Sequence, residues 1–412
     1  MNFGKIIKYH RRIQKLTQAE LSEGICSVSH LSKIENKSTE VDNEIIHLLL
    51  NKLSLAMDDL VVIDKKIKEE LSEFIDTIIF YDLDTARRIN TSLLEKEEFI
   101  SQTENIYLYH LYQYRYYLFS NDREQATFKK EFLSQFLNVL SPFESILYAY
   151  FNALFLIQTE QYHESLDLIK WVEKENSLSL NFLGELNYHI ALIHSTIKNN
   201  SFAIKYSQKA LVEYTREHNF IRVLHSQILL CINYTELGLY EDAIEHYKPL
   251  LRNTILTRQI SLLSTIHHNL AYLYEKKEEL SKAVFHYKFS LDNNQNSEFY
   301  FKTLYSLTEI LYRQGENNAA LIKVRELLKY TDNKNYRKYF LQSKYLYYLL
   351  NKNQKKAIDF LEKTLLPYLE QNNDKEDYLR YLLDLIDFYR DCDNKKTLYY
   401  YDLLLSTLEM KF

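Results

Sequence analysis

The sequence predicts an all-α protein in which a small N-terminal helical bundle precedes a long array of helix pairs. Glycine (5) and proline (3) are scarce among the 412 residues, so the turn chemistry of β-hairpins and glycine-rich phosphate loops is largely missing. The hydrophobic content of 46% and the charged content of 26% are those of an ordinary globular protein. A chain of this length exceeds one compact domain, which favours two domains or a repeat array.

The first helix is expected within residues 3–16. Apolar residues recur there at roughly helical spacing and would form its inner face: Phe3, Ile6, Ile7, Ile13 and Leu16. Arg11 and Arg12 then lie on other faces and make the outer surface basic. Residues 1–37 carry seven basic and three acidic side chains within a chain of net charge −5, so this segment is a modest basic patch.

Residues 17–37 carry the start and stop signals of two short helices joined by a tight turn. Thr17 can cap the first of them through a capping box with Glu20, and Gly24 can end it in a left-handed conformation. Ser27 or Ser29 can cap the second helix. Its apolar residues recur at three-residue intervals and are expected to point inward: Val28, Leu31 and Ile34. Such a pair is a helix-turn-helix, and the apolar residues that follow would close a five-helix core.

A helix-turn-helix that binds DNA places its second helix in the major groove, where polar side chains contact base edges and basic neighbours hold phosphates. The candidates on this helix and at its start are polar or basic: Ser27, Ser29, His30 and Lys33. Lys37 follows at the end of the same helix. The alternative is a helical bundle that contacts only proteins.

The remainder of the chain repeats one helix pair. Residues 64–75 are expected to form a charged helical linker, and a small residue then marks the second helix of each unit: Ala86, Ala126, Ser165, Ala203, Ala243, Ala283, Ala320, Ala357 and Thr397. Successive marks lie 37 to 40 residues apart. A small side chain is needed because the paired helices cross closely at that point. Gly238 and Gly315 fall where a turn between paired helices is expected.

The best-formed units, around Ala243 and Ala283, resemble the tetratricopeptide (TPR) repeat. About nine such pairs imply an α-solenoid, a right-handed superhelix with a concave groove. Extrapolated repeat register places these first-helix residues in or near the groove: Arg115, Tyr150, Tyr188, His225, Asn233, His268, Asn269, Tyr272, Lys302, Tyr305 and Arg313. Asn can donate to and accept from a peptide backbone, and Arg or Lys can pair with its carboxylates. The alternatives are a scaffold for protein partners and, for each residue, a structural role.

The segments LTQAELS and VSHLSKIEN resemble the helix-turn-helix of the Cro/phage-repressor (XRE) family, which has the lambda-repressor-like fold. From Gln18 to Glu35 the segment is one residue shorter than the common pattern, and Cys26 stands near the family's usual glycine. This short form is similar to the PlcR/NprR type of the RRNPP regulators, and it implies a phosphate contact for Gln18. The full set of expected DNA contacts is Arg11, Arg12, Thr17, Gln18, Ser27, Ser29, His30, Lys33 and Lys37.

The RRNPP resemblance covers the whole chain: an XRE domain at 1–63, the linker at 64–75 and TPR-like repeats at 76–412. It implies a homodimer or higher oligomer that binds an inverted-repeat operator in double-stranded DNA. A short signalling peptide in the TPR groove would control the affinity for DNA, as in quorum sensing. The alternative within the same resemblance is a Rap-like adaptor that binds a response regulator, with or without binding DNA.

No sequence motif points to catalysis, so the protein is not expected to be an enzyme. GxGxxG, Walker, HExxH and CxxC motifs are missing, and the three cysteines, Cys26, Cys231 and Cys392, are too widely spaced for a metal site. We therefore expect free thiols, no metal and no cofactor. No segment supplies the ~20 apolar residues of a membrane span and the start lacks the pattern of a signal peptide, which predicts a cytoplasmic location and no membrane partner.

Overall fold

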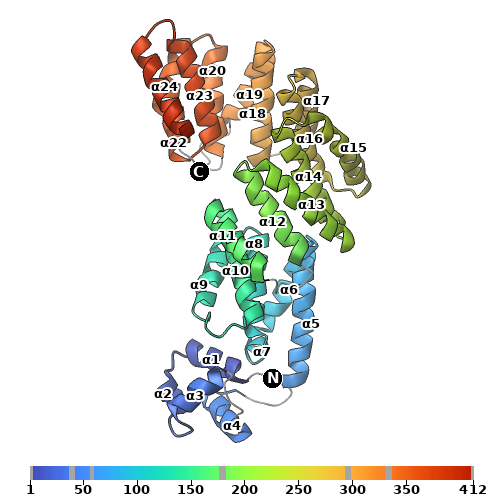
Figure 1. Ribbon diagram of the computed structural model, residues 1–412, viewed down its shortest axis with the longest axis vertical. Coiled ribbons are helices and arrows are strands. Elements are labelled where there is room, and N and C mark those ends of the chain that lie inside the picture. The colour runs from blue at the N-terminus through green and yellow to red at the C-terminus, as the bar shows by residue number, and fades with distance from the viewer. Residues whose placement is uncertain are drawn as a thin grey trace. The chain divides into compact units, whose positions relative to one another are not determined.

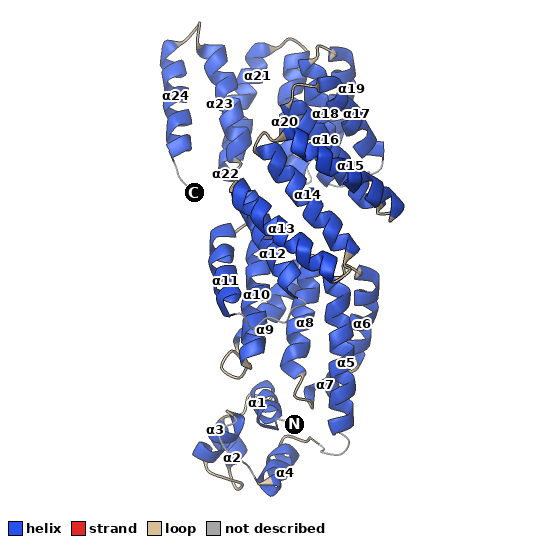
Figure 2. Cartoon of the chain, turned by 45° about the vertical axis from the view of Figure 1, so that its right-hand side comes forward, coloured by secondary structure: helices blue, strands red, loops and turns tan. Residues whose placement is uncertain are grey.

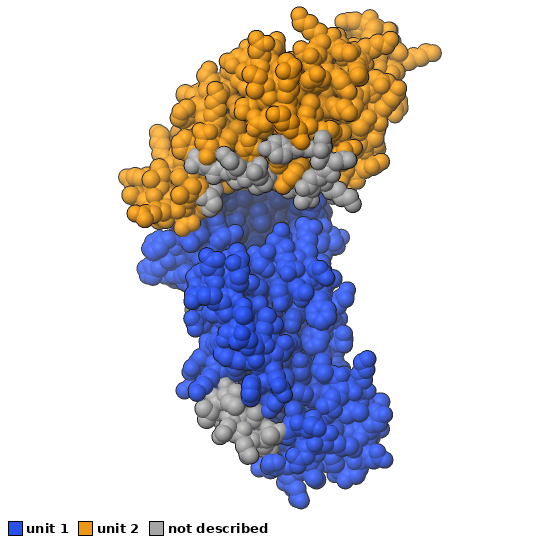
Figure 3. Space-filling view, turned by 180° about the vertical axis from the view of Figure 1, so that it is seen from behind, with its two compact units in different colours: residues 1–230 blue, residues 231–412 orange. Residues whose placement is uncertain are grey.

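The computed structural model describes residues 3–36, 42–55, 60–175, 182–292, 298–329 and 336–409. Within these ranges all regular secondary structure is helical and no strand occurs (Figure 2). The chain divides into two compact units, residues 1–230 and 231–412 (Figure 3). Scarce glycine and proline therefore predicted the fold class correctly.

The first unit begins with four helices that we call the head (Figure 1). They are α1 (Phe3–Ile13), α2 (Gln18–Ser22), α3 (Val28–Glu35) and α4 (Asn43–Lys52). The repeats of this unit follow as α5 (Leu60–Ile79), α6 (Leu83–Glu95), α7 (Glu97–Ser101), α8 (Ile106–Phe119), α9 (Arg123–Ser134), α10 (Pro142–Gln158), α11 (Tyr162–Glu175), α12 (Leu183–Thr196), α13 (Asn200–Arg216) and α14 (Phe220–Glu236), which crosses the boundary between the units.

The second unit continues the array of helix pairs. Its helices are α15 (Tyr240–Leu256), α16 (Ile260–Lys276), α17 (Leu280–Asp292), α18 (Glu298–Arg313), α19 (Asn317–Lys329), α20 (Arg337–Leu350), α21 (Gln354–Phe360), the π-helical segment η3 (Leu361–Leu365), α22 (Leu366–Gln371), α23 (Lys375–Tyr389) and α24 (Asn394–Glu409). The segment η3 joins α21 and α22 into one continuous second helix. TPR-like helical repeats thus extend through both units.

The head forms the predicted helix-turn-helix. Thr17 and Glu20 make the full capping box at the start of α2, and Gly24 adopts a φ of +78° in the turn. Ser27 caps α3 by accepting a hydrogen bond from the backbone N–H of His30 at 3.1 Å. A compact core forms among buried residues of all four helices and the segment after α4: Ile6, Ile7, Leu21, Leu31, Ile34, Ile46, Leu49, Leu50, Leu53 and Leu55.

Three details of the head differ from the expectation. Ile13, expected on the inner face of the first helix, is 48% exposed because it is the last residue of α1. Val28 is 46% exposed, because as the first residue of α3 it precedes the turn that packs against α1 and α2. The head contains four helices within its described residues, whereas five were expected. The following helix, α5, places Ile67, Leu71 and Phe74 in the core of the repeats, so the expected linker at 64–75 is helical but is packed as part of the first repeat pair.

Nine helix pairs make up the repeats in the described residues, with the short α7 between the first and second pairs. Every predicted small-residue mark lies on a second helix. The first eight, from Ala86 to Ala357, are fully buried, whereas Thr397 is partly exposed. The period of small residues therefore located the helix crossings from sequence.

The turn within each of the first eight pairs contains one residue in the left-handed region. Gly238 (φ +75°) and Gly315 (φ +78°) confirm the expected turns. The other six pairs use residues with a Cβ: Tyr81, Asn121, Glu160, Lys198, Glu278 and Lys352. In the turn that contains Gly238, the backbone N–H of Leu239 donates a hydrogen bond to the carbonyl oxygen of Tyr234 at 2.9 Å, as in a Schellman motif. This ending positions the second helix to fold back on the first.

Candidate nucleic-acid interface and repeat groove

The outer face of α3 carries the polar side chains expected to contact DNA. Ser27, Ser29 and Lys33 are exposed, and His30 is half-buried. Ser27 uses its hydroxyl as the helix cap. Lys37 lies outside the described residues. The four placed side chains come from one short helix and its cap, so the head offers a compact polar face of the kind that enters a major groove.

Glu35, the last residue of α3, ties the three helices of the helix-turn-helix together. Its carboxylate is fully buried and accepts two hydrogen bonds from Arg11 on α1, at 2.6 Å from Nε and 2.8 Å from Nη2. It also accepts a hydrogen bond from Nε2 of Gln18 on α2 at 2.8 Å. Arg11 completes its bonding by donating to the carbonyl of Leu16 at 2.9 Å. The recognition helix is therefore held by a bidentate ion pair with additional hydrogen bonds.

The structure corrects the expectation that Arg11 faces a phosphate, because this side chain is only 10% exposed and its donors point at Glu35 and Leu16. Lys8 is also buried and donates to Oδ1 of Asn36 at 3.2 Å. Burial lowers the pKa of the Lys8 ammonium, and the charge of Glu35 opposes that shift. The basic patch of the first 37 residues is thus smaller than its composition suggested.

The remaining head residues named from sequence have mixed environments. Arg12 is half-buried and donates to the carbonyl of Gln135 and, at 3.3 Å, to Oδ1 of Asn138, both outside the head. Thr17 is exposed but engaged in its capping box, and Gln18 is half-buried beside Glu35. The contact of Thr17 and Gln18 with DNA stays a prediction.

In the first unit, the predicted groove residues surround a buried charged cluster on the first helices. Arg115 on α8 and Arg222 on α14 both pair with one carboxylate oxygen of Glu185 on α12, the latter at 3.3 Å. Burial would raise the pKa of Glu185, but the guanidiniums outweigh it and hold the pKa below its ordinary value. The cluster therefore carries two positive charges and one negative charge away from water.

Aromatic and imidazole rings line this cluster. The hydroxyl of Tyr150 on α10 lies 2.8 Å from Nδ1 of His189, and burial lowers the pKa of His189 to about 3. His225 packs edge-on against Tyr81 with ring centroids 4.8 Å apart and lies 6.5 Å from the ring of Tyr188. Burial, with Arg222 nearby, lowers the pKa of His225 to about 4. Both histidines are therefore neutral at pH 7.

In the second unit, α16 presents three of the predicted residues. His268 is buried and its Nδ1 lies 2.9 Å from Oγ1 of Thr303. Burial, with Lys302 nearby, lowers the pKa of His268 to about 3. Tyr272 donates its hydroxyl to Glu236 at 3.0 Å. The buried Nδ2 of Asn269 has no hydrogen-bond partner among the described residues, which leaves one donor on this helix unsatisfied.

The predicted residues on α18 differ in exposure. Lys302 is exposed, whereas Tyr305 is buried with its hydroxyl 2.9 Å from that of Tyr381 on α23. Arg313 donates to Glu275 at 2.8 Å. Arg380, which the sequence did not single out, donates from Nη1 to both carboxylate oxygens of Glu309 beside these tyrosines, at 2.7 and 2.9 Å. The structure thus places Tyr305 and Arg313 in two separate polar groups, one with Tyr381, Arg380 and Glu309 and one with Glu275.

Five of the eleven predicted groove residues are buried in this structure, which favours the structural role that the sequence left open for each of them. They are Arg115, Tyr150, Asn233, His268 and Tyr305. Four of them bond to side chains on other first helices: Arg115 to Glu185, Tyr150 to His189, His268 to Thr303 and Tyr305 to Tyr381. The sequence missed Glu185, His189 and Arg222, although Glu and Arg at inner positions of successive first helices are a signal for such pairing.

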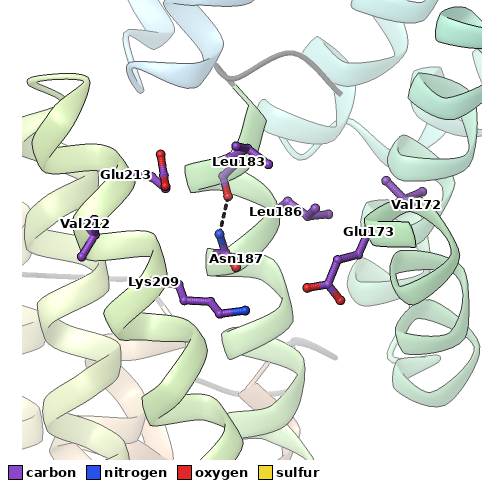
Figure 4. Close-up of a pocket in the computed structure, with 8 residues that line it drawn as sticks. All are labelled: Val172, Glu173, Leu183, Leu186, Asn187, Lys209, Val212 and Glu213. Atoms are coloured by element: carbon purple, nitrogen blue, oxygen red, sulfur yellow. Dashed lines mark hydrogen bonds between the residues drawn. The ribbon is translucent and has the colours of Figure 1, made fainter. Parts of the chain in front are cut away.

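A separate pocket of about 410 Å³ opens in the first unit (Figure 4). Its lining comes from α11, α12 and α13: Val172, Glu173, Leu183, Leu186, Asn187, Lys209, Val212 and Glu213. Glu173 and Lys209 extend toward it from opposite walls in Figure 4. No residue predicted from the sequence lines it, so this pocket is distinct from the candidate groove.

Comparison with known proteins supports both parts of the site. A family model described as helix-turn-helix matches residues 7–60. The transcriptional activator NprA of Geobacillus stearothermophilus is 28% identical over 388 residues, which cover 90% of this chain and 94% of that protein. Response regulator aspartate phosphatase A of Bacillus subtilis (strain 168) is 23% identical over 324 residues, 73% of this chain and 85% of that protein.

Two solved structures share the fold. The apo form of the quorum sensor NprR from B. thuringiensis superposes with a TM-score of 0.73 at 21% identity, covering 84% of this chain and 99% of that chain. NprR in complex with its cognate peptide NprX gives a TM-score of 0.67 at 22% identity, covering 86% and 99%. At this level of identity the likeness establishes the fold.

Fold and site together define the class: an all-helical protein in which a helix-turn-helix domain precedes TPR-like helical repeats. Within that class the chain is similar to the transcriptional activator NprA along most of its length, and residues 7–60 match the helix-turn-helix family. In the described ranges, no helix combines the length and apolar character needed to cross a membrane. The same ranges hold no group of three or more His, Cys, Asp or Glu side chains arranged for a metal ion.

Proposed function

We propose that this protein is a sequence-specific DNA-binding transcription regulator whose affinity for DNA is controlled by a short signalling peptide, as in quorum sensing. The observation that carries the proposal is the exposed polar face of α3, with Ser29 and Lys33, on a helix-turn-helix secured by Glu35. No catalytic step is part of the proposal. A cytoplasmic site of action follows because the DNA partner lies there.

The DNA target is proposed to be an inverted repeat bound by a homodimer or a higher oligomer. One α3 helix has only eight residues and can reach a few base pairs, whereas a two-fold dimer doubles the contacts and gives the affinity of a specific site. Ser29, His30 and Lys33 would contact base edges, with Gln18 and Lys37 at phosphates. This assignment rests on the helix-turn-helix geometry and on the relationship to a transcriptional activator.

The peptide is proposed to bind along the first helices of the repeats. The unsatisfied Nδ2 of Asn269 supports this placement, because a peptide carbonyl could accept its hydrogen bond. The related quorum sensor NprR is known in complex with a cognate peptide. A peptide alters DNA affinity only if it binds two arrangements of the repeats with different affinity.

A second function is supported by the relationship to response regulator aspartate phosphatase A. We propose that the repeats could also engage a response regulator as an adaptor, with or without DNA bound. The head, which a pure adaptor does not require, makes the DNA-binding function the better supported of the two.

The test is a gel-shift and fluorescence-anisotropy titration of the full chain on duplexes selected from a random pool, with and without candidate peptides. Lys33→Ala and His30→Ala should each weaken specific DNA binding at least about fivefold, the loss of one base-edge contact, and leave peptide binding unchanged. Asn269→Ala should do the reverse. Exposed Lys65→Ala and Asn318→Ala are the matched controls. Enrichment of no duplex sequence, with or without peptide, would count against DNA binding.

A further inference from the structure

Helix α1 packs against other parts of the first unit on two of its faces. One face, with Ile6 and Ile7, lies in the core of the head. The other, with Lys5, Tyr9 and Arg12, meets the repeats at intervals of four and three residues, which is one stripe of a helix. In Figures 1 and 2, α1 is accordingly the helix of the head that lies against the repeat helices of its unit. We call this second face, with its partners, the docking interface.

Tyr9 is the centre of the docking interface. It is 6% exposed and belongs to the hydrophobic core of the repeats, unlike Ile6 and Ile7. Its ring is surrounded by Tyr107, His110, Phe132 and Phe136, with centroids 5.8 to 6.4 Å away. Its hydroxyl lies 3.1 Å from Nε2 of His110. The head thus inserts one aromatic side chain into the core of the neighbouring domain.

Lys5 adds a buried ion pair to the docking interface. Its Nζ donates to both carboxylate oxygens of Glu144, at 2.6 and 2.9 Å, and both side chains are largely shielded from water. Glu144 is itself fixed, because it forms the capping box at the start of α10 with Ser141. The Lys5 ammonium also lies 5.8 Å from the centre of the Tyr107 ring. Because the Glu144 carboxylate is held in place, a shift of α1 would break its ion pair with Lys5.

Two further contacts restrict rotation about Tyr9. Nε2 of His10 lies 2.8 Å from the carbonyl oxygen of Ser101 at the end of α7. The guanidinium of Arg12 lies 5.4 Å from the centre of the Phe136 ring and donates to the Gln135 carbonyl. The contacts span both ends of α1, so they define an orientation and not merely an attachment point.

The recognition helix is connected to this interface by a short series of rigid contacts. Glu144 holds Lys5, α1 carries Arg11 on its opposite side, and Arg11 holds Glu35 at the end of α3. Ser29 and Lys33 on α3 are exposed and make none of these docking contacts. The docked head can therefore present α3 outward while its direction is dictated by the repeats.

We propose that Tyr9 and Lys5 are positioning residues that set the half-site spacing of the operator. This inference rests on the proposed function. In a dimer whose heads are docked rigidly, the two α3 helices lie at one separation and one relative rotation. Changing the spacer by two base pairs rotates one half-site by about 70° and moves it by about 7 Å, given 10–10.5 base pairs per turn. A docked dimer cannot follow that change, whereas an undocked dimer can.

The experiment uses the full chain and the inverted repeat that it selects from a random duplex pool. Anisotropy titrations compare the selected spacer with spacers two base pairs shorter and longer. The wild-type protein should bind both altered duplexes at least about thirtyfold more weakly, as expected when one head loses its contacts. Tyr9→Ala and Lys5→Met should bind all three duplexes within about threefold. Tyr9→Phe, which keeps the ring and loses only the hydroxyl, should retain most of the discrimination.

Controls separate this role from general loss of stability. Lys65→Met removes an exposed lysine from α5, and Tyr247→Leu removes a buried tyrosine from the second unit; both should discriminate as the wild type does. Amide hydrogen exchange without DNA gives an independent measurement, in which Tyr9→Ala should speed exchange in α1 and at the start of α8.

The outcomes are distinguishable. Unchanged discrimination in Tyr9→Ala and Lys5→Met would overturn the positioning role while leaving DNA binding intact. A wild-type chain that selects no duplex would defeat the proposed function and the spacing role together, and hydrogen exchange would then show whether the docking interface still exists. Spacer tolerance that appears only in the docking variants, with wild-type discrimination in both controls, supports the inference.

Discussion

Breaking the buried pair between Arg11 and Glu35 should destabilise the helix-turn-helix strongly. The Glu35 side chain is fully buried and that of Arg11 is 10% exposed. Removing one partner of such a pair costs about 3–5 kcal/mol, because the other charge stays buried without compensation. Glu35→Ala also removes the acceptor of the Gln18 hydrogen bond. The slowest-exchanging amides of α3 should then exchange at least about a hundredfold faster, since 1.4 kcal/mol corresponds to a factor of ten.

The assay is hydrogen exchange of the full chain, read separately for α1, α3 and a distant helix such as α16. Arg11→Met should give a loss in α3 similar to that of Glu35→Ala. The double variant Arg11→Met with Glu35→Leu replaces the pair by apolar side chains and should recover all but about 1–2 kcal/mol. Exchange in α16 should not change.

The two single variants and the double variant, compared in DNA binding, also decide whether Arg11 contacts a phosphate. If its role is to hold Glu35, the double variant should regain specific DNA affinity together with stability. A phosphate contact would be lost equally in the single and double variants. If each single variant lowers the free energy of opening of α3 by less than about 1 kcal/mol, the reasoning is refuted, because the pair then does not hold α3 in place.

Three further predictions concern protonation, turns and salt. Burial lowers the pKa of Lys129 from 10.5 to about 8. Between these two pH values the Lys129 amine holds its proton only in the unfolded chain, so the folded state becomes more stable as the pH rises. Urea titrations should show the free energy of unfolding of the wild type rising by up to about 3 kcal/mol relative to Lys129→Met. Glu160→Gly should stabilise the protein by about 0.5–1 kcal/mol and Gly238→Ala should destabilise it by a similar amount, because both positions have positive φ. A shift in Tm of the opposite sign for either variant would contradict this. At least four of the seven basic residues in the first 37 are engaged in internal contacts: Lys5, Lys8, Arg11 and Arg12. A dimer should therefore show a slope of log K against log salt no steeper than about −5.

Much of the fold could be predicted because its signals are local. The capping box of Thr17, the left-handed turn at Gly24 and the small-residue marks each depend on a few neighbouring residues, and all three are confirmed. The period of 37 to 40 residues located nine second helices without any long-range information. Such patterns are legible in sequence because helix ends and helix crossings impose residue size and conformation directly.

The environment of each charged side chain was far harder to predict. Arg11 and Arg12 are adjacent in sequence and look alike as parts of a basic surface, yet one is buried against Glu35 and the other lies against the repeats. Arg115 was expected to face a groove, and instead it pairs with Glu185, seventy positions along the chain. A charged residue's partner is set by which helices pack together, and one sequence does not state that.

The sequence alone therefore determined the kind of elements and their order: a helix-turn-helix with its caps, followed by helix pairs with small residues at the crossings. Only the tertiary structure decided which faces of those helices meet. It turned one side of α1 toward the repeats, placed Tyr9 in their core and left the outer face of α3 exposed. The physical reason is that helix formation and capping depend on residues a few positions apart, whereas docking depends on side chains about a hundred positions apart, such as Tyr9 and His110.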